Sequence, residues 1–219
     1  MTLIIIFFLF FYSFNCNKEN TQQISSPQQV TQTSKDSAKQ ISLSANQQKV
    51  LDGAKKTLAD NYEYDMSMAY YTIDFPNGDI DETIGVCTDV IVRALRKSGI
   101  TDLQKAINDD VKSDWNAYPM KRWKAKKPDS NIDHRRVMNL EVWFAKYWQT
   151  LNNDADFQPG DIVVWDMNQD GYSDHIGIVS DTFANGNYYV IHNHPNPGYV
   201  ANEDKLHLWE IIGHYRIKD

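Results

Sequence analysis

The chain has 219 residues, of which 42% are hydrophobic and 23% are charged, and its formal net charge at pH 7 is −7. This composition is typical of a globular protein with one domain of ordinary size. Three of the 22 basic and two of the 29 acidic residues precede residue 46, so the remainder carries about −8. Because a nucleic-acid partner normally requires a basic face, this charge argues against one.

The first sixteen residues, MTLIIIFFLFFYSFNC, contain an apolar run from Leu3 to Tyr12. The run is shorter than the roughly 20 residues of a membrane-spanning helix but has the length of a signal-peptide core. Cys16 ends it and opens a polar stretch, which resembles a bacterial lipoprotein signal. We therefore expect a signal peptide over residues 1–16, with lipidation of Cys16 and a membrane anchor. An uncleaved anchor and plain secretion are the alternatives, and all three place the domain outside the cytoplasm.

Residues 17–45 are rich in Gln, Ser, Thr and Asn and have only scattered apolar side chains. Such a segment buries too little surface to offset its chain entropy. We expect a disordered polar tether there and one folded domain over residues 46–219.

The first half of this domain has helical periodicity. Apolar residues at helical spacing predict an amphipathic helix over residues 46–60, and residues 62–85 predict extended chain with a Pro-Asn-Gly turn. In GVCTDVIVRALRKSG the apolar positions predict a helix that begins at Cys87 and stops at Gly99.

Two aspartates further along resemble helix N-caps. Asp102 precedes a helical pattern that continues to about Val111, and Asp133 precedes a longer one to about Thr150. Between them, YPMKRWKAKKPDSN predicts a basic and aromatic connection.

After Pro159 the period changes. DIVVWD, SDHIGIVSD, NYYVIHN and LHLWEIIGHYRI are rich in β-branched and aromatic residues and are separated by Gly, Asn and Pro clusters. Helices followed by consecutive strands predict an α+β domain, in which N-terminal helices pack on a C-terminal antiparallel sheet.

Cys87 is the only cysteine besides Cys16, so it has no disulfide partner once Cys16 carries lipid. A thiol is nucleophilic as thiolate, and a helix N-terminus and a nearby imidazole both lower its pKa. The first turn also offers free backbone N–H groups for an oxyanion. The alternative is a small buried core residue.

The imidazole partner is expected among the strands. Alternation places His175 on one sheet face and the following isoleucines on the other. A four-residue loop from Thr182 to Asn185 pairs residues whose numbers sum to 367, which sets His192 directly opposite His175. A turn at Asn185-Gly186 gives a sum of 371 and separates the two histidines along the same face.

The ordered motifs GVCTDV, QPGDIVVW, DHIGIV and VIHN resemble the landmarks of NlpC-type cell-wall peptidases, a papain-like superfamily. CTDVIVRALR, NIDHRRV, HIGIVSD and the terminal GHYR resemble more closely the YijF-like family of unknown function within that group. The resemblance implies a papain-like domain with Cys87 as nucleophile, His175 as general base and acid, and His192 as the residue that orients the base. It also implies cleavage of peptide or amide bonds, commonly in peptidoglycan stem peptides.

Two features depart from the typical superfamily pattern. Val86, Thr88 and Asp89 surround the cysteine where an aspartate before it and a serine after it are usual, and the segment between Cys87 and His175 is longer than usual. A cell-wall or partner-binding surface lipoprotein with a degenerate site, and a Cys/His acyltransferase, are therefore the alternative functions.

Four further residues are candidates for substrate binding. His134, Arg135 and Arg136 could form a patch for a substrate carboxylate, because arginine binds carboxylates in a bidentate manner. Asp89 is the fourth, although it could simply favour the first helical turn, and the patch could equally be paired within the protein.

A metal site is not expected, because the chain lacks close ligand spacings such as C-x-x-C, and we expect no other cofactor. DMNQDG at residues 166–171 matches the opening of a calcium loop but lacks its terminal Glu, so a hairpin turn is the preferred interpretation.

Overall fold

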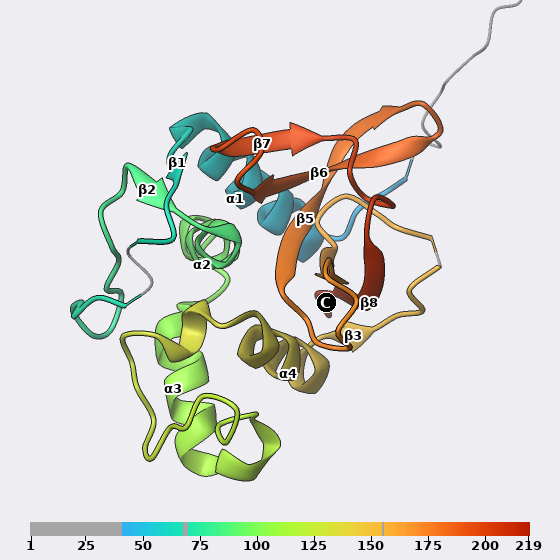
Figure 1. Ribbon diagram of the computed structural model, residues 1–219. Coiled ribbons are helices and arrows are strands. Elements are labelled where there is room, and N and C mark those ends of the chain that lie inside the picture. The colour runs from blue at the N-terminus through green and yellow to red at the C-terminus, as the bar shows by residue number, and fades with distance from the viewer. Residues whose placement is uncertain (1–40, 68–69, 155) are drawn as a thin grey trace, which may run out of the picture. The chain divides into compact units, whose positions relative to one another are not determined.

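The computed structural model describes residues 41–67, 70–154 and 156–219 (Figure 1). The expected signal peptide, Cys16 and residues 17–40 of the expected tether lie outside the described residues. The end of that tether is described, and it begins the fold. Ser44 Oγ accepts a hydrogen bond from the Gln47 amide at 3.2 Å, and Gln47 Oε1 accepts one from the Ser44 amide at 3.1 Å. This capping box starts the first helix at Ala45.

Four α-helices form the first part of the domain. They are α1 (Ala45–Asp60), α2 (Cys87–Lys97), α3 (Leu103–Ser113) and α4 (Val137–Tyr147). Short 3-10 turns lie at Trp115–Ala117 and Asp133–Arg135. Two strands between α1 and α2, β1 (Glu63–Tyr64) and β2 (Ile84–Gly85), form a small parallel pair. The helices expected at 46–60, after Cys87 and after Asp102 are confirmed.

One six-stranded antiparallel sheet forms the second part. Its strands are β3 (Gln149–Thr150), β4 (Ile162–Asp166), β5 (His175–Ala184), β6 (Asn187–Asn193), β7 (Val200–Glu203) and β8 (Glu210–Arg216). Their order across the sheet is β3-β8-β4-β5-β6-β7. The α+β class with an antiparallel sheet is therefore as predicted, and β7 and the three two-residue strands were not predicted.

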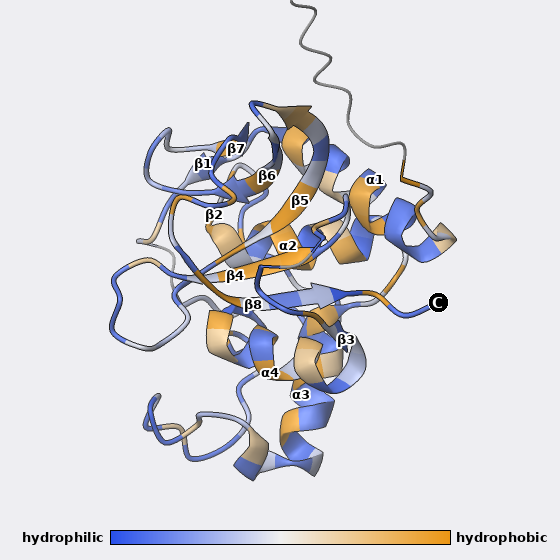
Figure 2. Cartoon of the chain, turned by 90° about the vertical axis from the view of Figure 1, so that its right-hand side faces the viewer, coloured by the Kyte–Doolittle hydropathy of each residue, from blue (hydrophilic) through white to orange (hydrophobic). Residues whose placement is uncertain are grey.

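The helices pack on one face of the sheet, and Figure 2 shows hydrophobic residues along β4 and β5 next to α2. Ile176 and Ile178 belong to the large core that they share with the helices. Val163, Trp165 and Val179 point to the opposite face and form a smaller cluster with Leu206. This alternation confirms the two faces predicted for the His175 strand.

The prediction for Asp133 is wrong. Arg136 is extended (φ −107°, ψ 118°) and separates the short 3-10 turn at Asp133 from α4, so the two do not form one helix. The Asp133 carboxylate accepts a hydrogen bond from the Asp129 amide at 2.7 Å and therefore closes the preceding turn. The helix also stops earlier than predicted, at Tyr147, because Gln149 and Thr150 pair with β8.

The PGD and GHYR motifs meet in the structure. Asp161 is fully buried at the start of β4, and its carboxylate accepts hydrogen bonds from His214 Nε2 at 2.8 Å and from Arg216 Nε at 2.7 Å. Gly160 has φ +89°, and a Cβ there would lie 2.7 Å from the Gln47 carbonyl oxygen. These motifs therefore fix β4 against β8 and α1.

Candidate active site

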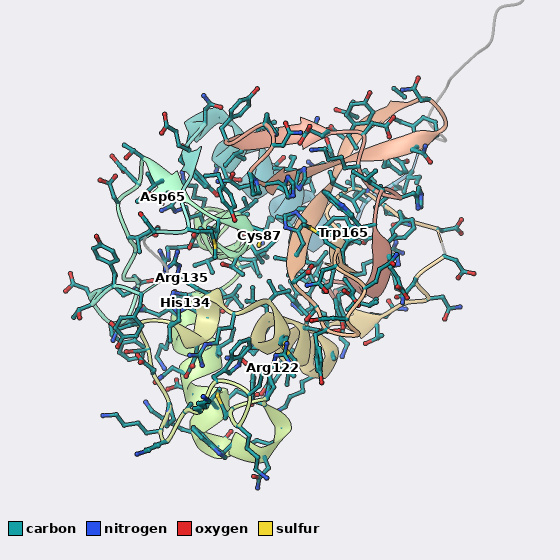
Figure 3. The ribbon with its side chains drawn as sticks, in the orientation of Figure 1. Asp65, Cys87, Arg122, His134, Arg135 and Trp165 are labelled. Carbon is teal, nitrogen blue, oxygen red and sulfur yellow. The ribbon has the colours of Figure 1, made fainter. Side chains whose placement is uncertain are left out.

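Cys87 is the first residue of α2, and Figure 3 shows it between α2 and β5. The helix starts here because Val86 is extended and the Asp89 carboxylate accepts a hydrogen bond from the Val86 amide at 2.7 Å. Cys87 is a free thiol with 9% of its surface exposed. It lines a cavity of about 510 Å³ together with Thr88 and His175.

The sulfur is not a preformed thiolate. Burial raises the pKa of the Cys87 thiol to about 12, and hydrogen bonds from the Ile176 and Thr88 amides oppose this only in part. The pKa of the thiol is therefore raised, and not lowered as expected at a helix N-terminus, because desolvation is its largest cause. Activation of the thiol requires a base that takes its proton.

His175 and His192 form the expected pair on one sheet face. His175 is the first residue of β5, and its Nε2 lies 2.7 Å from Nδ1 of His192 on β6. The backbone amide of Ile176, the residue after His175, lowers the pKa of the Cys87 thiol, so the thiol is close to the start of β5. The structure thus brings together the three residues to which the resemblance assigns catalytic roles.

Neither predicted register holds along the whole hairpin. Asn185 and Gly186 form the turn with φ 55° and 80°, and Ala184 pairs with Asn187, a sum of 371. A bulge between Val179 and Phe183 then changes the sum to 369, which sets His192 opposite Gly177 and makes it diagonal to His175. A Cβ on Gly177 would lie 3.2 Å from that of His192, so this glycine leaves room for the ring.

A third residue, Glu203 on β7, completes a hydrogen-bond chain. His192 Nε2 lies 3.1 Å from Glu203 Oε2. An ionised carboxylate only accepts, so His192 carries its proton on Nε2, and its Nδ1 accepts from Nε2–H of His175. This assignment leaves Nδ1 of His175 as the proton acceptor of the site.

Glu203 was missed in the sequence. The pattern of β7 is short, VANE, and carries little strand signal. The signal that could have found it is its pairing: His192 pairs with Ala201, and a residue two positions further lies on the same face.

The histidines are neutral in this environment. Burial lowers the pKa of His192 to about 4, although the Glu203 carboxylate acts in the opposite direction. Burial lowers the pKa of His175 well below its usual value, and the neighbouring His192 and His194 add to the effect. A neutral His175 beside a neutral thiol is a general base that has its acceptor nitrogen free.

Aromatic rings surround the pair. Trp165 and Trp209 lie 5.5 and 5.4 Å from the His175 ring, centroid to centroid. Tyr64, on β1, lines the Cys87 cavity, and burial and the cysteine raise its pKa. The cavity combines aromatic and aliphatic side chains with charged ones, including Arg136, Asp170 and Asp174.

Asp89 and Arg135 bind each other instead of standing open to a ligand. The Arg135 Nε and Nη2 atoms donate to the two Asp89 oxygens at 2.8 and 3.0 Å, and each side chain is 3% exposed. Thr88 Oγ1 also donates to the Arg135 carbonyl oxygen at 3.3 Å. This pair holds the start of α2 against the 3-10 turn at Asp133–Arg135.

The remaining two binding candidates differ in position. His134 is 2% exposed and lies outside the cavity lining, and burial lowers its pKa to about 4. Arg136 lines the cavity, donates to Asp133 at 3.0 Å and lies over the Trp123 ring at 4.9 Å. The expected patch of three basic residues is therefore not one continuous surface.

The DMNQDG segment is a hairpin connection between β4 and β5. Asp166 Oδ2 accepts a hydrogen bond from the Gly171 amide at 2.7 Å, and Asp174 Oδ1 accepts one from the Met167 amide at 2.9 Å. Among the described residues, no group of three or more His, Cys, Asp or Glu side chains is arranged to hold a metal ion. Within the same residues, no helix has the length and apolarity to cross a membrane.

The fold and this cavity define an α+β protein with a buried thiol and a histidine pair at one end of an antiparallel sheet. The chain belongs to the family described as a domain of unknown function (DUF1287), whose model matches residues 51–217. It is 45% identical over 171 residues to the Uncharacterized protein YijF of Escherichia coli (strain K12), covering 76% of this chain and 80% of that relative. The predicted membership in the YijF-like family is confirmed.

Among solved structures, the chain is similar to two crystal structures of an N-acetylmuramoyl-L-alanine amidase from Bacteroides uniformis ATCC 8492. Each is 12% identical, covers 77% of this chain and 100% of its own, and has a TM-score of 0.45. The relationship to NlpC-type peptidases stays a prediction.

Proposed function

We propose that the chain is an extracytoplasmic cysteine amidase or peptidase with a papain-like, NlpC-type domain, and that it cleaves amide bonds in peptidoglycan stem peptides. One observation carries the proposal. Cys87 begins a helix in the cavity that also contains His175, and a hydrogen-bond chain through His192 to Glu203 orients that histidine.

The reaction begins with a neutral pair. Nδ1 of His175 takes the thiol proton while the sulfur forms a bond to the carbonyl carbon. Backbone N–H groups at the start of α2 bind the oxyanion. The imidazolium then donates its proton to the leaving amine, the C–N bond breaks, and a thioester to Cys87 remains. His175 next removes a proton from water, which cleaves the thioester and restores the thiol.

Glu203 and His192 act through His175. When His175 becomes positively charged, its Nε2–H donates to His192, and His192 donates to the Glu203 carboxylate. The chain therefore holds the ring in one tautomer and stabilises the charged form that appears during the reaction.

The substrate class and location rest on the sequence. The signal-like segment at residues 1–16 supports a location outside the cytoplasm, where peptidoglycan is the abundant amide polymer. Lipidation of Cys16 would hold the domain at the membrane and near that polymer.

The test compares wild type and Cys87→Ala on peptidoglycan fragments, with products identified by mass. Cys16→Ser in both proteins makes Cys87 the only thiol of the wild-type form. We expect new amine and carboxyl termini from wild type alone, and equal product from both proteins would refute the nucleophile. An added amine separates hydrolysis from acyl transfer, because transfer yields the amide of that amine. If both proteins bind the fragments equally and neither cleaves them, the result supports the alternative of a cell-wall-binding surface lipoprotein with a degenerate site.

Thiol alkylation against pH tests the base. We expect wild type to react at lower pH than His175→Ala, because the imidazole accepts the thiol proton. Identical profiles would show that His175 does not activate the Cys87 thiol.

A further inference from the structure

Arg122 differs from the other arginines of the chain in its partners. The other five each bind a carboxylate: Arg93 to Asp79, Arg96 to Asp102, Arg135 to Asp89, Arg136 to Asp133, and Arg216 to Asp161. The Arg122 guanidinium forms no hydrogen bond or ion pair with the part of the chain that the structure describes, and its contacts are with aromatic rings. Arg122 is exposed and lies in the basic segment of residues 121–127.

Its position is fixed by its neighbours. Met120 is 1% exposed, and Trp123 Nε1 donates to Asn139 Oδ1 on α4 at 3.3 Å, so the chain is anchored on both sides of Arg122. The guanidinium lies over the Tyr172 ring, with its carbon 3.7 Å from the ring centroid. This contact connects the loop before α4 to the β4–β5 hairpin.

Stacking leaves the hydrogen-bonding edge of the guanidinium available. A ring contact uses the face of the planar group, while its N–H donors point outward in the plane. Arg122 lines the same 510 Å³ cavity as Cys87 and His175, and Figure 3 shows it next to α4. Its free donors are therefore at the cavity that contains the thiol.

The carboxylates that line the cavity have other partners. Asp170 Oδ1 accepts a hydrogen bond from the Tyr172 amide at 3.1 Å, and Asp174 Oδ1 accepts one from the Met167 amide at 2.9 Å. Both side chains hold the hairpin loop together. The protein thus supplies no carboxylate to Arg122, although it does so for the two other arginines at the cavity, Arg135 and Arg136.

We infer that Arg122 binds a free carboxylate of the substrate and makes the site selective for peptides that carry one near the cleaved amide. The inference rests on the proposed function and narrows its substrate class. A planar guanidinium binds a carboxylate through two parallel hydrogen bonds, and these are stronger than neutral ones. A lysine at this position would keep the charge and lose that geometry.

The test measures binding separately from cleavage. Cys87→Ala protein is titrated by calorimetry with a synthetic stem tripeptide that has free carboxylates, and with the same tripeptide in which every carboxylate is a carboxamide. We expect a preference of about tenfold or more for the carboxylate form, the usual effect of one charge-assisted hydrogen-bonded pair. Adding Arg122→Met should reduce the preference to about twofold or less, and Arg122→Lys should retain part of it.

Lys121→Met is the matched control, because it removes the neighbouring positive charge on an exposed side chain outside the cavity lining. Its preference should equal that of the parent. The inference is overturned if Arg122→Met keeps the preference, if Lys121→Met reduces it equally, or if neither tripeptide binds. Hydrolysis by the Cys87→Ala protein would refute the proposed nucleophile alone, since the carboxylate preference is still read from binding.

Discussion

Replacing Arg135 by methionine should destabilise the domain strongly. The substitution removes both hydrogen bonds to Asp89, at 2.8 and 3.0 Å, and leaves that carboxylate charged in a site where it is 3% exposed. Removing one partner of a buried pair costs about 3–5 kcal/mol, because the other charge stays buried without compensation. For a domain of this size, that loss lowers the melting temperature by roughly 10 °C.

The neutral double variant should recover most of this loss. Asp89→Asn keeps an oxygen that can accept the hydrogen bond from the Val86 amide, so the cap of α2 is retained. Asp89→Asn/Arg135→Met therefore buries no unpaired charge. We expect it to be more stable than Arg135→Met by about 2 kcal/mol or more, a coupling that a double-mutant cycle measures.

Urea unfolding followed by tryptophan fluorescence gives the free energies of unfolding. The matched control is Arg122→Met, an arginine without a carboxylate partner among the described residues, which should change the stability by about 0.5 kcal/mol or less. A loss below about 1 kcal/mol for Arg135→Met, with a raised KM for peptide substrates, would contradict the structural role. It would support the substrate-binding role that the sequence suggested for Arg135 and Asp89.

Three further predictions concern the histidines. His134, His175 and His192 have pKa values lowered by burial, so the unfolded state binds more protons below pH 6.5. Stability should fall between about pH 6.5 and pH 4, by about 1.4 kcal/mol per pH unit for each fully titrating group, and a constant melting temperature from pH 7 to pH 5 would contradict this. Gly177→Ala should lower kcat by tenfold or so while the fold persists, because its Cβ would lie 3.2 Å from that of His192; unchanged kcat would refute the tight packing. Glu203→Gln should lower kcat by at least about tenfold with little change in KM. Kinetics equal to wild type would show that Glu203 does not act through His192 on His175.

Local sequence patterns were sufficient for most elements. Helical spacing located α2 and its first residue, and alternation separated the two faces of β5, because both follow from the side-chain periods of regular structure. Either hairpin register that we considered also placed His175 and His192 on one face. These predictions depend on residues that are close in the sequence, and the structure agrees with them.

The register of the histidine hairpin could not be predicted in the same way. The Asn185-Gly186 pair favours a two-residue turn, and this turn is present. The bulge that follows depends on how β5 bends, and Ser180 and Thr182 bond to each other there instead of continuing the regular pairing. Such a shift leaves the alternation of the strand unchanged, so no pattern in the sequence reports it.

Burial raises the pKa of the Cys87 thiol, whereas the helix N-terminus and a nearby imidazole were expected to lower it. A helix N-terminus lowers a thiol pKa by a modest, short-range amount, whereas removal from water raises it by several units. The sequence shows the helix start but not the depth of the residue. The neutral thiol and neutral His175 change the proposed first step from attack by a preformed thiolate to attack coupled with proton transfer.

Two features in which the sequence departs from the NlpC-type pattern that it resembles contact each other in the structure. One is the set Val86, Thr88 and Asp89 around the cysteine, and the other is the long segment that contains Arg135. Asp89 and Thr88 both form hydrogen bonds with Arg135, which lies 46 and 47 positions further along the chain. The same segment contains Arg122 at the cavity. The Asp89–Arg135 ion pair therefore connects the start of α2 to the segment that contains Arg122. A substitution of either ion-pair residue should shift both Cys87 and Arg122.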